Sequence, residues 1–303
     1  MKVLITGATG LIGSKLVELC HENGINVNYF TTSREKIEDK PNYKGFYWDP
    51  DNDEIDKKAF EGVSAIVNLV GATISKRWTK SYKKTILESR THTANLIYES
   101  LQQIDHNILH FVSASGVSRY PNSKTKLYTE ENTEVDDSFL AEVVVAWEAA
   151  AVQFKSLGMD VAKVRTGVVF SKEEGAFPTI IKPIKYGMGA AIGSGKQWLP
   201  WIHIDDIVGI YFHILQNQLE GIYNAVAPNP VTNHKLNKQI AEKLEVPFWL
   251  PNIPSFLLKL ALGEMAILVT EGQLVSSRKI EQRGYTFKHY NLESALDDLL
   301  EKK

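Results

Sequence analysis

The sequence from Val3 to Gly13 reads VLITGATGLIG, and it predicts a strand, a glycine-rich turn and the start of a helix. The first four residues form a short apolar run of strand character. Apolar residues then recur at Leu16 and Leu19, a spacing typical of an amphipathic helix. Gly24 is a candidate for the C-cap of that helix. This strand–turn–helix unit at the start of the chain determines the predicted fold class.

Each glycine of the turn has a separate expected task. Gly7 permits the tight turn, Gly10 lets the backbone approach a pyrophosphate, and Gly13 lets the helix pack closely on the strand. The free N–H groups of a helix N-terminus favour phosphate. The spacing G-x-x-G-x-x-G therefore predicts a dinucleotide site, and a turn selected only for packing is the alternative. The expected cofactor contacts here are Gly7, Thr9, Gly10, Leu11, Ile12 and Gly13.

Composition narrows the class of protein. The chain has 303 residues, 44% of them hydrophobic, which is enough for a substantial core. A formal net charge of −2 gives no general attraction to nucleic acid or to anionic membranes. The one cysteine, Cys20, excludes an internal disulfide and a cysteine zinc cluster. Without a membrane-length apolar run or a visible signal peptide, we expect a cytoplasmic protein. The oligomeric state is not predicted.

The residues after the second expected strand, 26–31, decide the cofactor type. An acidic residue there would bind the ribose hydroxyl of NAD, whereas a basic residue suits the 2′-phosphate of NADP. The chain continues with Thr32, Ser33 and Arg34, and it has no carboxylate at this point. Two hydroxyls and a guanidinium can bind a phosphate, so the sequence favours NADP(H). The alternative is that Arg34 only solvates the loop.

Strands and helices alternate along most of the chain. Further strands are expected at 45–48, 65–69, 107–113, within 159–170 and at 221–226; helices are expected at 80–102, 139–154, 205–215, 234–244 and 256–270. Asp205 is the expected N-cap of the helix that follows it. The alternation predicts an α/β fold with a Rossmann-type, doubly wound parallel sheet. Residues 1–170 with 205–226 would form this domain, and 171–204 with 227–303 a smaller C-terminal lid, with substrate in the cleft between them.

The usual proton relay of such folds, Tyr-x-x-x-Lys on a helix, is missing. The one literal match joins Tyr120 to Lys124, but Pro121 disfavours helix there. The helix 139–154 contains neither tyrosine nor lysine. The remaining catalytic candidates are Ser115, at a strand end, and Tyr120, in a loop. The alternative for Ser115 is that its hydroxyl only hydrogen-bonds backbone groups at the strand end.

Four further residues are candidates for substrate contacts: Arg77, Arg90, Trp201 and His203. Arg90 lies on an apolar helix face, where a structural salt bridge is the alternative. His203 could titrate, or it could be a buried, hydrogen-bonded histidine. No metal site is expected, because the histidines are scattered.

Several motifs together resemble one family. They are the glycine-rich start, residues 68–71, KRWT at 76–79, SAS at 113–115, FLAE at 139–142, WEA at 147–149, RTGVV at 165–169, GSGKQW at 193–198 and WIHIDD at 201–206. The chain resembles the atypical, extended short-chain dehydrogenases/reductases, in particular the "epimerase family" proteins with a C-terminal domain of unknown function. The resemblance implies a Rossmann fold and NADP(H).

The resemblance also implies further cofactor contacts. Leu69, Val70 and Gly71 would line the adenosine side, Ser113 and Ser115 would lie near nicotinamide, and Arg165 and Val168 would follow the nicotinamide face. The chain departs from sugar epimerases by lacking the tyrosine and lysine, and by having Ser89 where those enzymes often have asparagine.

The resulting hypothesis is an NADP(H)-binding oxidoreductase or epimerase that acts on an unidentified small molecule. In it, Ser115 would orient the reacting oxygen, and Tyr120 or a bound water would carry the proton. The alternative is a non-catalytic protein whose conformation responds to NADP(H).

Overall fold

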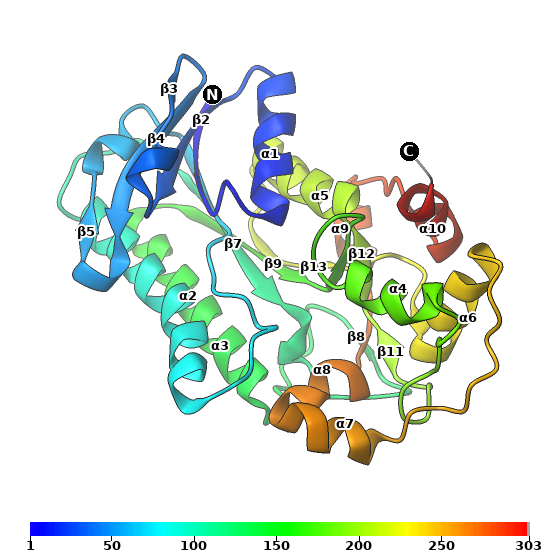
Figure 1. Ribbon diagram of the computed structural model, residues 1–303. Helices are drawn as coiled ribbons and strands as arrows, with labels where there is room; N and C mark the ends of the chain where they lie inside the picture. Colours follow the sequence, from blue (N-terminus) through cyan, green and yellow to red (C-terminus); the bar gives the residue numbers. More distant parts are fainter. Residues whose placement is uncertain (302–303) are drawn as a thin grey trace. The chain divides into compact units, whose positions relative to one another are not determined.

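The structure, a computed structural model, describes residues 1–301, and its largest sheet is mostly parallel (Figure 1). The strands of this sheet are β1 (Lys2–Thr6), β2 (Asn26–Thr31), β3 (Asp39–Lys40), β4 (Tyr43–Asp49), β5 (Glu54–Ile55), β6 (Ala65–Asn68), β7 (His110–Gly116), β9 (Asp160–Thr166) and β13 (Gly221–Ala225). Their order is β13-β9-β7-β6-β1-β2-β4-β3, with β5 paired to β4.

The direction of winding reverses between β1 and β6. Strands β1, β2 and β4 progress toward one edge of the sheet, whereas β6, β7 and β9 progress toward the other. The pairs β1–β2, β1–β6, β2–β4 and β6–β7 are all parallel. This arrangement confirms the predicted Rossmann-type, doubly wound α/β fold, in which ligands bind at the carboxyl ends of the strands beside the reversal.

Helices cover both faces of the sheet. They are α1 (Leu11–Glu22), α2 (Lys80–Leu101), α3 (Phe139–Val152) and, later in the chain, α5 (Ile204–Gln216). Figure 1 shows α1 on the opposite side of the sheet from α2 and α3. A core beneath α2 and α3 joins Ile97 and Phe154 to strand residues such as Ile66 and Phe111. The predicted helix at 80–102 is thus confirmed almost to the residue.

The chain divides into two compact units. The first comprises residues 1–115, 142–165 and 208–223, and the second 116–141, 166–207 and 224–303. The remaining elements are β8 (Leu127–Tyr128), β10 (Val168–Phe170), β11 (Trp198–Leu199), β12 (Trp201–His203), β14 (Val231–Thr232), β15 (Leu274–Val275), α4 (Phe177–Lys185), α6 (Asn233–Lys243), α7 (Ser255–Leu262), α8 (Ile267–Thr270), α9 (Arg278–Gln282) and α10 (Leu292–Leu300). A separate core of the second unit packs α4, α6 and α10 around Phe170 and Trp201.

Three local expectations were wrong in detail. The strand expected within 159–170 is interrupted at Gly167, after which β10 pairs with β12 instead of the main sheet. The helix expected at 256–270 is broken at Gly263, whose φ of +60° is incompatible with a continuous helix. Helix α5 begins at Ile204, so Asp205 lies in its first turn, and the Asp205 N–H donates to Nδ1 of His203 at 3.2 Å.

No helix in the described part of the chain is both long enough and apolar enough to cross a bilayer.

We predict that Gly167→Ala destabilises the protein by about 3 kcal/mol through steric overlap. A Cβ at residue 167 would stand 2.1 Å from the carbonyl oxygen of Pro200, which is backbone and cannot turn aside. The control is Gly158→Ala, where nothing lies within 4 Å and only the positive φ of +77° is strained, at a cost of about 1 kcal/mol. Urea unfolding of the two variants measures the difference; equal losses would contradict the steric explanation.

Candidate functional site

The loops that follow β1 and β6 are bonded together at the reversal of the sheet. The hydroxyl of Thr6 donates to Oδ1 of Asn68 at 2.7 Å. The same hydroxyl oxygen accepts the N–H groups of Leu69 at 3.1 Å and Val70 at 3.2 Å. Gly7 has a φ of +69°, and a Cβ there would lie 3.2 Å from the carbonyl carbon of Leu69. Two chain segments distant in sequence thus form one rigid edge.

The glycine turn leaves the N-terminus of α1 open. Gly10 is the N-cap residue of this helix, and no side chain caps the helix there. A Cβ on Gly13 would stand 2.1 Å from the carbonyl oxygen of Gly7, so only glycine lets the helix approach the turn this closely. Thr9 and Gly10 are exposed, and Leu11 and Ile12 are partly exposed. Backbone N–H groups near this end are therefore available to an anion.

Arg34 lies just beyond the carboxyl end of β2, the direct neighbour of β1 in the sheet. Its guanidinium stands over the ring of Tyr47, 3.7 Å from the ring centroid, and this stacking orients the side chain. Thr32 and Arg34 are exposed, and Ser33 is partly exposed. The sheet therefore places a cation and two hydroxyls at the edge that carries the glycine turn.

The hydroxyl of Ser115 is part of a buried network of charged side chains. Its hydroxyl donates to Oε1 of Glu148, on α3, at 2.7 Å. Arg165, on β9, donates to the same carboxylate from Nε at 2.7 Å and from a terminal nitrogen at 2.9 Å. Lys163 contributes a second cation, 3.6 Å from Oε2. The predicted residues Ser115 and Arg165 are thus brought together, through a carboxylate that was not predicted.

The network keeps Glu148 ionised. Burial alone would raise the pKa of its carboxyl, but the hydrogen bonds and charge of Arg165, with help from Lys163 and Ser115, outweigh burial and lower the pKa below its ordinary value. The ionised carboxylate accepts hydrogen bonds and has no proton to give. Because the Ser115 hydroxyl donates to it, the free side of the Ser115 oxygen acts as an acceptor.

Glu148 and Lys163 are functional candidates that the sequence analysis missed. A usable signal was nonetheless present: Arg165 directly follows Val164 in a predicted strand, and a buried arginine requires a carboxylate partner. Glu148 occupies a buried position of a very apolar helix, and a buried carboxylate likewise requires a cationic partner.

Arg90 is held by backbone carbonyls. Its terminal nitrogens donate to the carbonyls of Ile86 at 2.8 Å and Ala72 at 3.1 Å, and the guanidinium lies 4.9 Å from the ring centroid of Trp147. Burial lowers its pKa to about 10. Arg77, by contrast, is exposed in the loop before α2. Carbonyl oxygens thus occupy two of the donors of Arg90.

Tyr120 is completely buried. Its hydroxyl donates toward Oδ1 of Asn224 at 2.9 Å and the carbonyl of Thr129 at 3.1 Å, and its ring stacks on Tyr128. The segment 120–124 is not helical, as predicted, so Lys124 does not form a helical pair with Tyr120. These contacts favour a structural role, and a catalytic role of Tyr120 stays a prediction.

The other predicted residues are also located. Trp201 is buried, and its indole N–H donates to the carbonyl of Asn229 at 3.2 Å. His203 is buried beside His289, and burial together with His289 lowers its pKa to about 4. The Ser113 hydroxyl donates to the carbonyl of Ala114, and Val168 is partly buried in β10. The contacts of these residues with substrate or cofactor stay predictions.

Comparisons with known proteins agree on one family. Residues 3–225 match the "NAD dependent epimerase/dehydratase family", and residues 253–299 match a "domain of unknown function (DUF1731)". An epimerase family protein of Staphylococcus haemolyticus is 35% identical over 301 residues, which cover 98% of each chain. The crystal structure of human epimerase family protein SDR39U1 with NADPH has 30% identity, a TM-score of 0.84 and 99% coverage of each chain. A nucleoside-diphosphate sugar epimerase from Corynebacterium glutamicum has 29% identity and a TM-score of 0.78, covering 99% of this chain and 58% of that one.

We predict that Glu148→Gln lowers the free energy of unfolding by about 3 kcal/mol at pH 7, because Arg165 loses its buried counter-charge. The pKa of Glu148 is lowered in the folded protein, so its stabilisation is present above the unfolded pKa and is lost as pH falls through the folded pKa. The difference between wild type and variant should therefore shrink below about pH 4. Urea unfolding across this pH range is the measurement.

The matched control for this prediction is Glu142→Gln, an exposed glutamate on the same helix. It should change the free energy of unfolding by at most about 0.5 kcal/mol at any pH. A Glu148→Gln effect that does not depend on pH would contradict an ionic role for the carboxylate.

Proposed function

Because the chain belongs to the NAD-dependent epimerase/dehydratase family, as the sequence motifs indicated, we propose that it binds NADP(H) and transfers hydride to or from a small molecule. The single observation that carries this proposal is the open N-terminus of α1 behind the glycine turn, at the reversal of the sheet. Within residues 1–301 no side chain caps that helix end, and the family is described as NAD-dependent.

The residues at this edge fit a dinucleotide. The turn from Gly7 to Gly13 offers backbone N–H groups to a pyrophosphate. The amide nitrogen of Asn68 is buried at the same edge and has no acceptor within residues 1–301, so it can donate to a ligand. In our proposal Leu69, Val70 and Gly71 line the adenosine side, and Ser113, Arg165 and Val168 lie toward the nicotinamide.

Arg34, with Thr32 and Ser33, supports the choice of NADP(H) over NAD(H). A guanidinium and two hydroxyls suit a 2′-phosphate, and the position has no carboxylate to receive a ribose hydroxyl. The human relative's crystal structure is described as containing NADPH, which is consistent with this choice.

Nicotinamide supplies the hydride chemistry when it is bound. In our proposal Ser115 is the residue that contacts the reacting oxygen. The hydroxyl of Ser115 donates its own proton to Glu148. Its oxygen therefore accepts a hydrogen bond, which suits an alcohol better than a carbonyl as the bound group. We assign the proton transfer to a bound water, since the Tyr120 hydroxyl is buried and bonded to Asn224.

A second candidate function follows from α3, which carries a buried glutamate and neither tyrosine nor lysine. On this alternative the protein is a non-catalytic binder whose conformation responds to NADP(H). The two candidates share the cofactor site and differ in whether Ser115 takes part in chemistry.

For the cofactor, we predict that wild type prefers NADPH over NADH and that Arg34→Ala loses about tenfold in NADPH affinity with little change for NADH. Fluorescence titration of the reduced nicotinamide measures all four affinities. Lys36→Ala, two residues further on and exposed, is the control and should retain the preference. Equal affinities in wild type would contradict NADP specificity, and no binding by folded protein would contradict the whole proposal.

For the chemistry, we predict that Ser115→Ala abolishes turnover of NADP⁺ with alcohol and nucleotide-sugar panels, and of NADPH with the matching carbonyls, while leaving NADPH affinity within about threefold, because the serine orients the substrate rather than the cofactor. Nicotinamide absorbance follows turnover. Ser118→Ala, a nearby serine with no assigned role, is the control. If wild type binds NADPH but turns over no compound, or if Ser115→Ala is fully active, the non-catalytic alternative or another catalytic group is favoured.

A further inference from the structure

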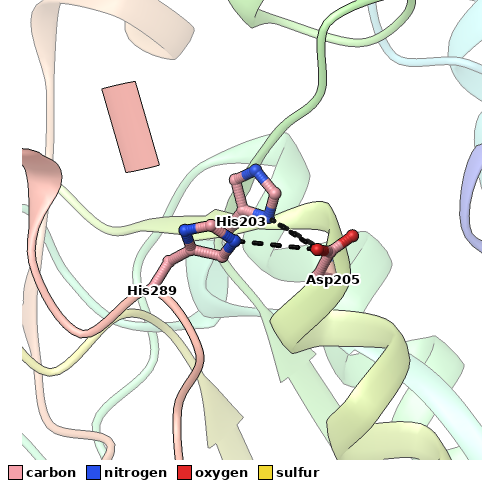
Figure 2. A group of neighbouring side chains, drawn as sticks. All are labelled: His203, Asp205 and His289. Atoms are coloured by element: carbon pink, nitrogen blue, oxygen red, sulfur yellow. Dashed lines mark hydrogen bonds and ion pairs between the residues drawn. The ribbon is translucent and has the colours of Figure 1, made fainter. Parts of the chain in front are cut away.

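Two histidines and an aspartate converge inside the second unit. His203 is the last residue of β12, Asp205 lies in the first turn of α5, and His289 lies in the segment between α9 and α10. Residues His203 and His289 are 1% and 6% exposed, and their ring centroids are 3.7 Å apart. Figure 2 shows a nitrogen of each imidazole directed toward the carboxylate of Asp205.

The inner atoms are spaced as metal ligands are. Nε2 of His289 is 3.6 Å from Oδ2 of Asp205, and Nδ1 of His203 is 4.0 Å from that oxygen. Ligand atoms around a tetrahedral zinc ion lie about 3.4 Å apart. Nε2 of His289 is buried and makes no hydrogen bond within residues 1–301. We propose that His203, Asp205 and His289 bind a divalent transition-metal ion of the zinc class.

The outer nitrogen of each imidazole faces an acceptor. Nδ1 of His289 is 3.4 Å from the carbonyl oxygen of Ser294, which leaves the lone pair of its Nε2 free to point inward. Nε2 of His203 lies 3.3 Å from Oδ2 of Asp298 as an ion-pair contact that does not have hydrogen-bond geometry, so this support is electrostatic. An outer carboxylate or carbonyl on the far nitrogen is the usual support of a metal-binding histidine, because it fixes both ring orientation and tautomer.

The frame around the three residues is preorganised. Asp206 is fully buried and accepts the backbone N–H groups of Lys288 at 2.7 Å and His289 at 3.0 Å, together with the Tyr285 hydroxyl at 3.1 Å. These bonds fix the segment that carries His289 against the start of α5. An ion would therefore meet ligands that are already positioned.

Two existing contacts of the ligand atoms would be replaced by bonds to the ion when it binds. The ammonium of Lys288 is 2.5 Å from Oδ2 of Asp205, and the Asp205 N–H donates to Nδ1 of His203. The surrounding charge favours the exchange: the carboxylates of Asp205, Asp206 and Asp298 outnumber the ammonium groups of Lys288 and Lys172, which pairs with Asp298.

Three protein ligands leave at least one coordination position of a tetrahedral ion unfilled. The Asp205 side chain is 32% exposed, so this position opens toward solvent on the side of the carboxylate. Water or a small anionic ligand could then coordinate the ion. The proposal is independent of the NADP(H) site, because none of the three metal ligands is among the residues proposed to contact that cofactor.

The test is titration of the purified, chelator-treated full chain with Co²⁺, followed by competition with Zn²⁺. We expect one Co²⁺ per chain, with the intense visible absorption of a four-coordinate ion, and its displacement by Zn²⁺. His289→Phe and Asp205→Asn should each weaken Co²⁺ binding at least about tenfold, whereas Lys288→Met should tighten it about tenfold by freeing Oδ2.

The matched control is His92→Gln, which removes the histidine of an exposed His92–Asp53 pair and should leave Co²⁺ affinity unchanged. Circular dichroism confirms that each variant is folded, and Lys288→Met gives a gain of affinity that misfolding cannot imitate. The proposal is overturned if neither wild type nor Lys288→Met binds Co²⁺, or if His289→Phe and Asp205→Asn bind it as wild type does.

Discussion

The edge of the sheet that we propose as the cofactor site depends on one buried hydroxyl, that of Thr6. It donates to Asn68 and accepts the N–H groups of Leu69 and Val70, so the ends of β1 and β6 cannot separate without leaving several buried polar groups unpaired. The turn at Gly7 packs against the same loop. The sheet reverses its winding here, so these hydrogen bonds fix the part of the sheet edge that supports the glycine turn and α1.

Helix α3, which has neither the tyrosine nor the lysine of the usual proton relay, carries Glu148 in a buried position. A salt bridge between Glu148 and Arg165 closes around the Ser115 hydroxyl, and Lys163 stands beside it. Such a network stabilises one rotamer of the serine and one charge state of the glutamate. If Ser115 contacts the substrate as proposed, its oxygen would accept a hydrogen bond from a substrate hydroxyl group.

The fold and the glycine turn could be predicted from sequence because their signals are local: apolar periodicity, glycine spacing and strand–turn–helix order. The Ser115–Glu148–Arg165 network and the His203–His289 pair could not, since each joins residues distant along the chain. The scatter of the histidines argued against a metal site, yet the fold stacks two of them beside Asp205. Likewise, the breaks at Gly167 and Gly263 follow from close backbone approach and from φ, which periodicity does not report.

The division of the first unit into three stretches of sequence has a consequence for synthesis on the ribosome. Its last stretch, 208–223, contains most of β13, the strand that covers β9 in the sheet. Until those residues have been translated, the outer edge of β9 has no hydrogen-bonding partner strand. Residues 166–207, which belong to the second unit, are translated during this interval. The nascent chain therefore exposes the unpaired edge of β9 during this interval, and such an edge promotes aggregation.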